Sequence, residues 1–188
     1  MSRRSWCAVA CFTAAAALLS SSLDVVEVSL ASMEPTIHDG DYVVVVKRLS
    51  PLGGIFVRTP GRETIVVLCL AGRPGASVAS GLYLKRVVAV PGDRVRIHAG
   101  TLILNNVPVR EPYAAHPTAA AREADMWPDT ILHRRDVVVP YGRLFVLGDN
   151  RAESLDSRVW GMLEESAVRG IVIFTAHLGR WRRRAPER

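Results

Sequence analysis

Residues 82–98 have the sequence LYLKRVVAVPGDRVRIH, and this stretch decides the fold class. An apolar run rich in Val and Leu ends at the turn signal Pro91-Gly92-Asp93, and a second short run follows it. The same alternation of short β-type runs and turn signals fills the chain after Asp24. Many short strands at this spacing predict a mainly β domain of coiled antiparallel sheets with a barrel-like core. We expect strands at Val25–Leu30, Tyr42–Val46, Thr64–Leu70, Leu82–Val90, Val95–His98, Thr101–Leu104, Val137–Val139, Leu144–Leu147 and Ile171–Phe174.

A chain of 188 residues has room for one main domain and a smaller appendage. We expect a cytoplasmic stub and membrane anchor over residues 1–23, a β-rich domain over 24–178 and a basic tail over 179–188. A polar insertion at 110–136 contains the only helix candidate outside the N-terminus, around Thr118–Asp125.

An uncharged stretch of 19 residues runs from Ser5 to Leu23. As a helix it would span about 28 Å at ~1.5 Å per residue, close to the ~30 Å hydrocarbon core of a bilayer. Two arginines precede the stretch, and Asp24 and Glu27 follow it. This asymmetry predicts a single-pass plasma-membrane anchor with the N-terminus in the cytoplasm and the domain outside the cell. A cleavable secretory signal is the alternative, because the stretch is short and rich in alanine.

Basic residues outnumber acidic ones, and the formal net charge is +6. Such a balance suits anionic lipid and nucleic acid equally well, so charge alone identifies no partner. The basic tail at Arg180–Arg184 is compatible with lipid contact and with a solvated end. The three cysteines form no CxxC pattern, so a zinc or redox site has no support and we expect no metal or other cofactor.

Ser32 begins the motif Ser32-Met33-Glu34-Pro35-Thr36, just after the first expected strand. Pro35 disfavours helical geometry at Glu34, which places the serine on an extended-to-turn corner. A serine at a strand end is usually a turn hydroxyl, so this motif alone is weak evidence for a nucleophile.

Lys85 shares one face of its expected strand with Tyr83 and Val87, while Arg86 points the other way. Burial among these neighbours would lower the pKa of the lysine, which a lysine needs in order to accept a proton near neutral pH. Of the 24 basic residues 22 are Arg, which stays protonated and cannot do this. Taken alone, an edge-strand lysine that reaches solvent remains the simpler interpretation.

Residues 148–161 have the sequence GDNRAESLDSRVWG. Small, polar and oppositely charged side chains at this density suggest a turn tied by internal hydrogen bonds and ion pairs. Asp149 with Arg151, and Asp156 with Arg158, are the expected local pairs. On its own this motif predicts an ordered surface loop.

In this order the three motifs resemble those of the type I signal peptidase family of serine peptidases (S26). The resemblance covers Ser32 to Gly161, and the expected anchor fits it as well. It implies the coiled antiparallel fold that signal peptidases share with self-cleaving repressors. It also implies a membrane-bound serine endopeptidase that removes signal peptides from exported preproteins.

The resemblance assigns a role to each matching residue. Ser32 would be the nucleophile, Lys85 its general base, and Ser154 the hydroxyl that orients the lysine. A salt-linked framework would hold Ser154 in place through Asp149, Arg151, Asp156 and Arg158. The substrate would pair by β-addition in a groove lined by Leu30, Met33, Tyr83 and Leu84.

Leu30 departs from the family pattern. Many members have a serine two residues before the nucleophile, where its hydroxyl helps the oxyanion hole, and other members have glycine. With leucine there, the Ser32 backbone N–H becomes the main expected donor. Loss of one such donor typically costs ~10²–10³ in rate.

The implied reaction needs no cofactor. Neutral Lys85 takes the proton from Ser32 as it attacks the carbonyl after a small residue, and a water activated by Lys85 then hydrolyses the acyl-enzyme. We expect preproteins that carry signal peptides and membrane lipid as partners, no nucleic acid, and a monomer.

Four alternatives compete with this hypothesis, one in the catalytic base and three in the function. A histidine-based triad has little support, because nothing marks His38, six residues from Ser32, as a base. A related Ser/Lys peptidase of the pilin-maturing type should lack the full 148–161 motif, and a self-cleaving repressor needs a DNA-binding domain where this chain has an apolar stretch. An inactive membrane-tethered β-domain that binds peptides is disfavoured by the intact Ser32 and Lys85.

Overall fold

The structure, a computed structural model, describes Thr13, Ala17 and residues 19–50, 59–70, 81–98, 100–115 and 136–177. Within these residues the fold is mainly β and contains two antiparallel sheets. The larger sheet has the order β1 (Leu23–Glu27), β2 (Tyr42–Lys47), β11 (Val168–Ala176), β3 (Ile65–Cys69), β4 (Leu82–Ala89), β9 (Arg143–Leu147) and β10 (Leu163–Glu164). The smaller has the order β7 (Val107–Pro108), β6 (Thr101–Leu104), β5 (Arg94–His98) and β8 (Val137–Val138).

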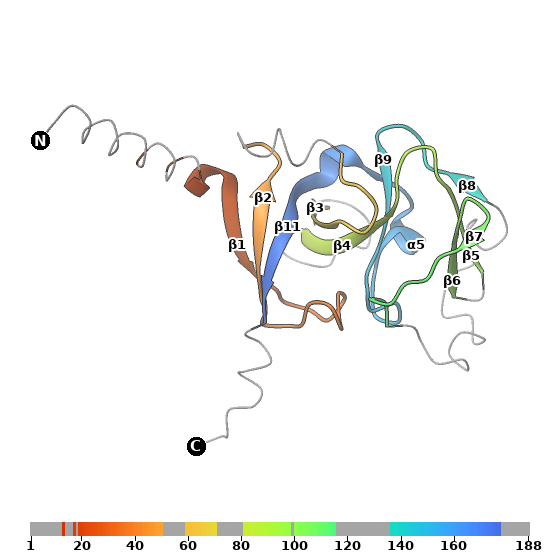
Figure 1. The fold of residues 1–188 in the computed structure, drawn as a ribbon, viewed down its shortest axis with the longest axis horizontal. Helices are drawn as coiled ribbons and strands as arrows, with labels where there is room; N and C mark the ends of the chain where they lie inside the picture. Colours follow the sequence, from red (N-terminus) through yellow and green to blue (C-terminus); the bar gives the residue numbers. More distant parts are fainter. Residues whose placement is uncertain are drawn as a thin grey trace, which may run out of the picture.

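The larger sheet curls, so that its strands change direction from β1 to β9 (Figure 1). β4 lies between β3 and β9 and has six buried residues out of eight. Its side chains enter two cores because neighbouring positions of a strand face opposite ways. Tyr83 and Val87 pack with Leu68 and Val146, whereas Val88 and Ala89 help to join the two sheets.

A third apolar cluster lies under the loop of residues 28–41, which joins β1 to β2. Met33 is 1% exposed and Ile37 is fully buried, and both pack against Val43, Val45 and Val67. Burying two such side chains contributes about 1.5–3 kcal/mol each. The loop that contains Ser32 is therefore held firmly against the large sheet.

Each of the nine expected strands is present, and the mainly β prediction is confirmed. The first strand differs most, because it runs over Leu23–Glu27 and leaves the sheet before Val28. There the Val28 N–H bonds to the Asp41 carbonyl at 2.8 Å and closes the loop instead. The sequence missed the two-residue strands β7 and β10, which are too short for an alternating pattern.

Close to the expected boundary between anchor and domain, residues 19–22 are helical and Leu23 already pairs with Val46. Most of the expected anchor lies outside the described residues, as do the helix candidate Thr118–Asp125 and the basic tail at 179–188. Within the described part of the chain, no helix is both long and apolar enough to span a membrane.

The expectation of a single helix candidate beyond the N-terminus was wrong. A short helix, α5 (Ser157–Trp160), lies inside the 148–161 motif, and a 3₁₀ turn, η1 (Glu165–Ala167), follows it. The Asp156 side chain caps α5 by accepting a hydrogen bond from the Arg158 N–H. The sequence did not reveal α5, because four residues are too few to show helical periodicity.

Candidate active site

Lys85 is buried on β4, with a side chain that is 1% exposed. Its Nζ makes hydrogen bonds to Ser32 Oγ at 2.7 Å and to the Leu84 carbonyl at 2.9 Å. The Tyr83 ring lies beside it, with its centroid 5.8 Å from Nζ. The prediction of a buried lysine on the same face as Tyr83 is confirmed, and the first two motifs meet at one hydrogen bond.

The surroundings of Lys85 lower its pKa from 10.5 to about 8. Burial is the largest cause, because the ammonium ion loses its hydration. The negative charges of Asp156 and Asp149 act the other way, and the positive charge of Arg158 adds to the lowering. A substantial neutral fraction therefore exists just above neutral pH.

The third motif holds the backbone around Ser32. The Asn150 N–H bonds to the Ser32 carbonyl at 3.1 Å, and Asn150 Nδ2 bonds to the Ala31 carbonyl at 3.2 Å. Sequence reasoning gave Asn150 no role, although it lies inside the motif. Asn150 thus donates one hydrogen bond from its backbone N–H and a second from its side-chain amide, each to a backbone carbonyl of the Ser32 loop. We call these two hydrogen bonds the Asn150 clamp.

Gly148 packs closely against the Ser32 backbone and the Ser154 side chain. A Cβ atom at Gly148 would lie 2.5 Å from the Ser32 carbonyl oxygen and 2.2 Å from Ser154 Oγ. Neither distance is compatible with a side chain, so the close approach of the two motifs requires glycine here.

Asp149 does not pair with Arg151, and this expectation was wrong. The fully buried carboxylate of Asp149 receives both arms of Arg86, with Nε–Oδ1 at 2.8 Å and Nη2–Oδ2 at 2.6 Å. Thr36 Oγ1 donates to the same carboxylate at 2.6 Å. The Arg86 guanidinium also stacks 4.0 Å from the Tyr113 ring centroid. A paired, planar contact of this kind outweighs a local pair in a tight turn.

Arg151 instead binds Glu111, with bonds of 2.8 and 2.6 Å between the guanidinium and the carboxylate. Both side chains are buried, at 4% and 1% exposed. Glu111 lies at the start of the segment expected to be an insertion, and Ala115 bridges to Asn150. Residues 111–115 therefore belong to the support of the site.

The local pair Asp156–Arg158 is confirmed, with both N–O distances at 2.7 Å. Asp156 Oδ2 also accepts the Gly148 N–H at 3.0 Å, and Arg158 donates to the carbonyls of Arg151 and Ser154. These contacts join α5 to both ends of the motif. We call the pairs Arg86–Asp149, Arg151–Glu111 and Arg158–Asp156 the ion-pair framework.

Ser154 is buried next to Gly148, but its hydroxyl does not bond to Lys85 in this structure. Its Oγ donates weakly to the Leu155 carbonyl at 3.5 Å, while Lys85 Nζ bonds to Ser32 and Leu84. An orienting role for Ser154 stays a prediction.

A groove of about 300 Å³ opens beside Ser32. The four residues predicted to contact substrate all line it, namely Leu30, Met33, Tyr83 and Leu84. The remaining lining comes from residues 26–29, Val67 and Leu82, so the walls are mostly apolar. Such walls suit an extended apolar peptide.

Leu30 has a backbone φ of 104°, a region that L-residues with side chains rarely adopt. Its side chain is 57% exposed, and its N–H donates to Asp39 Oδ1 at 3.1 Å. The Leu30 N–H is therefore already used and is not a spare donor for an oxyanion.

Comparison with known proteins identifies the family of this chain. A sequence model described as "Signal peptidase, peptidase S26" matches residues 3–177. The chain belongs to this family. As a member of it, the chain is a serine endopeptidase.

Named relatives agree with this family. The chain is 32% identical over 157 residues to signal peptidase I of Bacillus amyloliquefaciens, covering 78% of this chain and 72% of that protein. It is 33% identical over 141 residues to signal peptidase I U of Bacillus subtilis strain 168, covering 74% and 68%. A crystal structure of a signal peptidase I from Enterococcus faecalis V583 aligns with a TM-score of 0.43 at 26% identity, over 62% of this chain and 98% of that one.

Leu30→Gly should make this S26 peptidase more stable. The positive φ costs about 1–3 kcal/mol for a residue with a side chain, and glycine adopts it at an entropic cost of about 0.5–1 kcal/mol. We expect the unfolding midpoint to rise by about 2–4 °C in a thermal melt. Leu49→Gly is the control, since Leu49 is 89% exposed and has no positive φ. A lower unfolding midpoint for Leu30→Gly than for the wild type would contradict the claim that the backbone is strained at Leu30.

Gly148→Ala should lower the activity, because the Cβ that it adds meets the Ser32 carbonyl oxygen and the buried Ser154 side chain, which cannot easily move aside. The new Cβ would push the Ser32 carbonyl, and a displacement near 1 Å at a reacting group costs about 10² in rate. We expect kcat/KM towards a preprotein to fall at least that far. Gly61→Ala is the matched control, because Gly61 has no neighbouring atom within 4 Å of the added Cβ. Equal activity of the two variants would mean that the motifs do not need this close contact.

Proposed function

We propose that this S26 peptidase is a membrane-bound enzyme that removes N-terminal signal peptides from exported preproteins. Ser32 acts as the nucleophile and Lys85 as the general base. The observation that carries the proposal is the 2.7 Å hydrogen bond between Lys85 Nζ and Ser32 Oγ. It joins a buried lysine to a serine that lines a mostly apolar groove.

The proton follows the hydrogen bond already present. Neutral Lys85 accepts the Ser32 proton as Oγ attacks the carbonyl carbon of the scissile bond. The resulting lysinium donates a proton to the leaving amine of the mature protein, and an acyl-enzyme remains on Ser32. Lys85 then deprotonates a water that hydrolyses the ester and restores the serine. Its pKa of about 8 suits both directions of transfer near neutral pH.

The geometry supports one main oxyanion donor. The Leu30 N–H bonds to Asp39, whereas the Ser32 N–H makes no hydrogen bond within the part of the chain that the structure describes. In the proposed mechanism the Ser32 N–H stabilises the tetrahedral intermediate, and the Asn150 clamp keeps it oriented. One donor in place of two lowers the rate without changing the pathway.

The groove supports binding of an extended peptide. The segment before Ser32 and the start of β4 both line it, so a substrate would lie between two lengths of extended chain. Small residues at the first and third positions before the cut, which the family resemblance implies, would let the substrate backbone approach Ser32.

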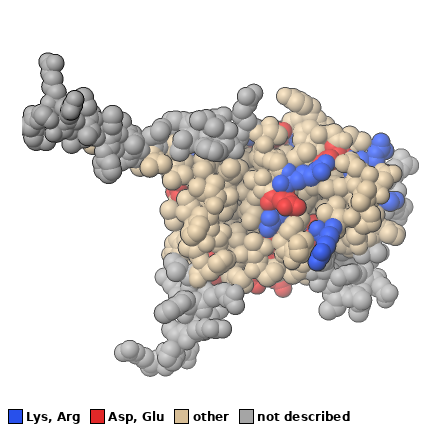
Figure 2. All heavy atoms as spheres, in the orientation of Figure 1, with Lys and Arg blue, Asp and Glu red and all other residues tan. Residues whose placement is uncertain are grey.

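Membrane attachment is part of this proposal. Large apolar side chains are exposed in the helical residues before β1, along the groove and on β1 and β11, namely Leu19, Leu30, Leu82, Val25, Ile173 and Phe174. Figure 2 shows that the region over β1, β2 and β11 has few charged side chains in this view, whereas most visible Lys and Arg lie towards the smaller sheet. We place the apolar N-terminal stretch in the plasma membrane, the N-terminus in the cytoplasm and the catalytic domain outside, with the apolar region towards the lipid.

Ser32→Ala and Lys85→Met should each abolish cleavage of a preprotein by the purified full chain in detergent. Loss of the nucleophile or of its base removes the covalent step, and we expect at least about 10³-fold lower kcat/KM. Lys47→Met is the matched control, because Lys47 is the other lysine of the chain and lies on β2, away from the groove lining. Full activity of either of the first two variants would refute the Ser/Lys assignment. A panel of preproteins, including pilin-type substrates, separates a general enzyme from a dedicated one.

The pH dependence of kcat/KM should report the titration of Lys85. Its pKa is lowered to about 8, and the active form is the neutral one. We therefore expect kcat/KM to rise with pH, to reach half its plateau near pH 8, and to fall about tenfold per unit below that. A profile that stays flat from about pH 6 to pH 9 would exclude a lysine base with this pKa.

A further inference from the structure

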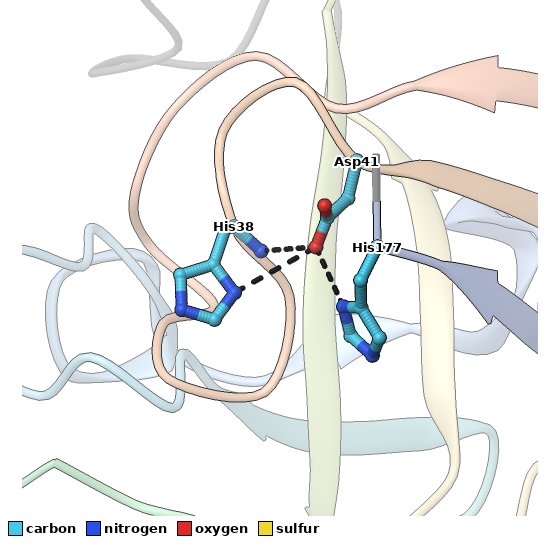
Figure 3. Close-up of side chains that lie close together, drawn as sticks. All are labelled: His38, Asp41 and His177. Atoms are coloured by element: carbon cyan, nitrogen blue, oxygen red, sulfur yellow. Dashed lines mark hydrogen bonds and ion pairs between the residues drawn. The ribbon is translucent and has the colours of Figure 1, made fainter. Parts of the chain in front are cut away.

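The side chains of two histidines and an aspartate lie close together where the loop of residues 28–41 approaches the end of β11. His38 and Asp41 come from the second half of the loop, and His177 follows the last residue of β11 (Figure 3). Asp41 and His177 are 136 positions apart in the chain. None of the three residues lines the groove beside Ser32, so the cluster is separate from the proposed catalytic site.

Three potential ligand atoms converge on one point of space. Asp41 Oδ2 lies 2.9 Å from His177 Nδ1 and 3.7 Å from His38 Nδ1, and one ligand atom from each of the three residues lies within 4.8 Å of the other two. The imidazole rings are nearly perpendicular, at 78°, so they do not stack. Around a tetrahedral Zn²⁺ with bonds of ~2.0–2.1 Å, ligand atoms lie about 3.3 Å apart. The two observed distances bracket that value.

His38 Nδ1 is the second observation that points to a ligand. The atom is buried and has no hydrogen-bond partner among the described residues, although it faces the Asp41 carboxylate. At 3.7 Å the contact is too long for a hydrogen bond. A buried nitrogen without a partner is costly, and a bound cation would use its lone pair.

Asp41 is held ready for this task. Its side chain is fully buried, and Oδ2 accepts the backbone N–H of His38 at 2.9 Å. A ligating carboxylate that is also hydrogen-bonded keeps its orientation before the metal arrives. The His177 side chain is 51% exposed, which leaves solvent access and room for a water as fourth ligand.

We propose that His38, Asp41 and His177 bind a divalent transition-metal ion of the Zn²⁺ class. Two imidazole nitrogens and one carboxylate oxygen suit Zn²⁺, Co²⁺ or Ni²⁺, whereas Ca²⁺ and Mg²⁺ prefer oxygen ligands alone. The ion takes no part in peptide cleavage. It ties the loop that contains Ser32 to the end of β11, and so links the position of the nucleophile to an interior strand of the larger sheet.

Metal titration of the full chain in detergent tests the proposal directly. The protein must be untagged, because a polyhistidine tag would bind the same ions, and it is first stripped with a chelator that is then removed. We expect one equivalent of Co²⁺ to give visible absorption bands typical of low coordination number, and Zn²⁺ to displace it. Zn²⁺ should also raise the unfolding midpoint by a few degrees, since it binds the folded state.

Variants assign the site. His38→Ala and His177→Ala should each weaken metal affinity by about tenfold or more, since each removes one of three ligands. His98→Ala is the control, because His98 lies on β5 in the smaller sheet, and it should bind as the wild type does. Ser32→Ala should also bind as the wild type does, which separates this test from that of the proposed function.

Two results would overturn the inference. One is a wild-type protein that shows no saturable binding at micromolar metal concentrations. The other is binding that survives unchanged in both His38→Ala and His177→Ala, because the ion would then lie elsewhere. The histidine variants are preferred to an Asp41 variant, since the buried Asp41 also closes the loop and its loss could unfold the protein.

Discussion

Burial of Lys85 is the constraint around which the rest of the site is built. A lysine with a pKa of about 8 in the folded state and about 10.5 in the unfolded chain destabilises the fold, because the folded state resists protonation. The penalty is about 3 kcal/mol, is fully present below pH 8, and disappears as pH rises towards 10.5. It is a large fraction of the stability of a typical domain. The apolar clusters on either side of β4 must therefore outweigh it.

The ion-pair framework offsets part of that penalty while holding the loops. Asp149 and Asp156 raise the pKa of Lys85, but each of them is already paired with an arginine. Free carboxylates at the same places would raise the pKa of the lysine further, and their removal would leave buried arginines unpaired. Paired carboxylates avoid both outcomes. The same pairs fix residues 148–158, whose backbone and Asn150 side chain in turn hold the Ser32 loop.

The strands were predictable because their side-chain patterns are local. Runs of Val, Ile and Leu between turn signals located nine strands, and the face shared with Tyr83 made Lys85 a candidate for burial. The resemblance to the family motifs predicted that Ser32 and Lys85 lie in contact. These predictions needed information from only a few neighbouring residues at a time.

The partners of the arginines were not predictable, because they depend on which distant segments the fold brings together. Arg151 was expected to bind a residue two positions away, and it binds Glu111, 40 positions away, instead. Arg86 was expected only to point away from Lys85, and that direction lets it reach Asp149, 63 positions away. The same limit applies to His38 and His177, which are unremarkable in the sequence and meet only because the loop and β11 both end at β2.

Three separate sets of contacts hold the loop that contains Ser32. Its apolar residues, Met33 and Ile37, anchor it from below, Asn150 holds its backbone from the side, and Asp41 closes its base. With these three attachments the loop can tolerate the strained backbone at Leu30, which a free loop would relax. The strained backbone of Leu30 and the buried Lys85 side chain thus lie within one small region. Both persist because the surrounding contacts determine the geometry of Ser32 more strongly than the local sequence does.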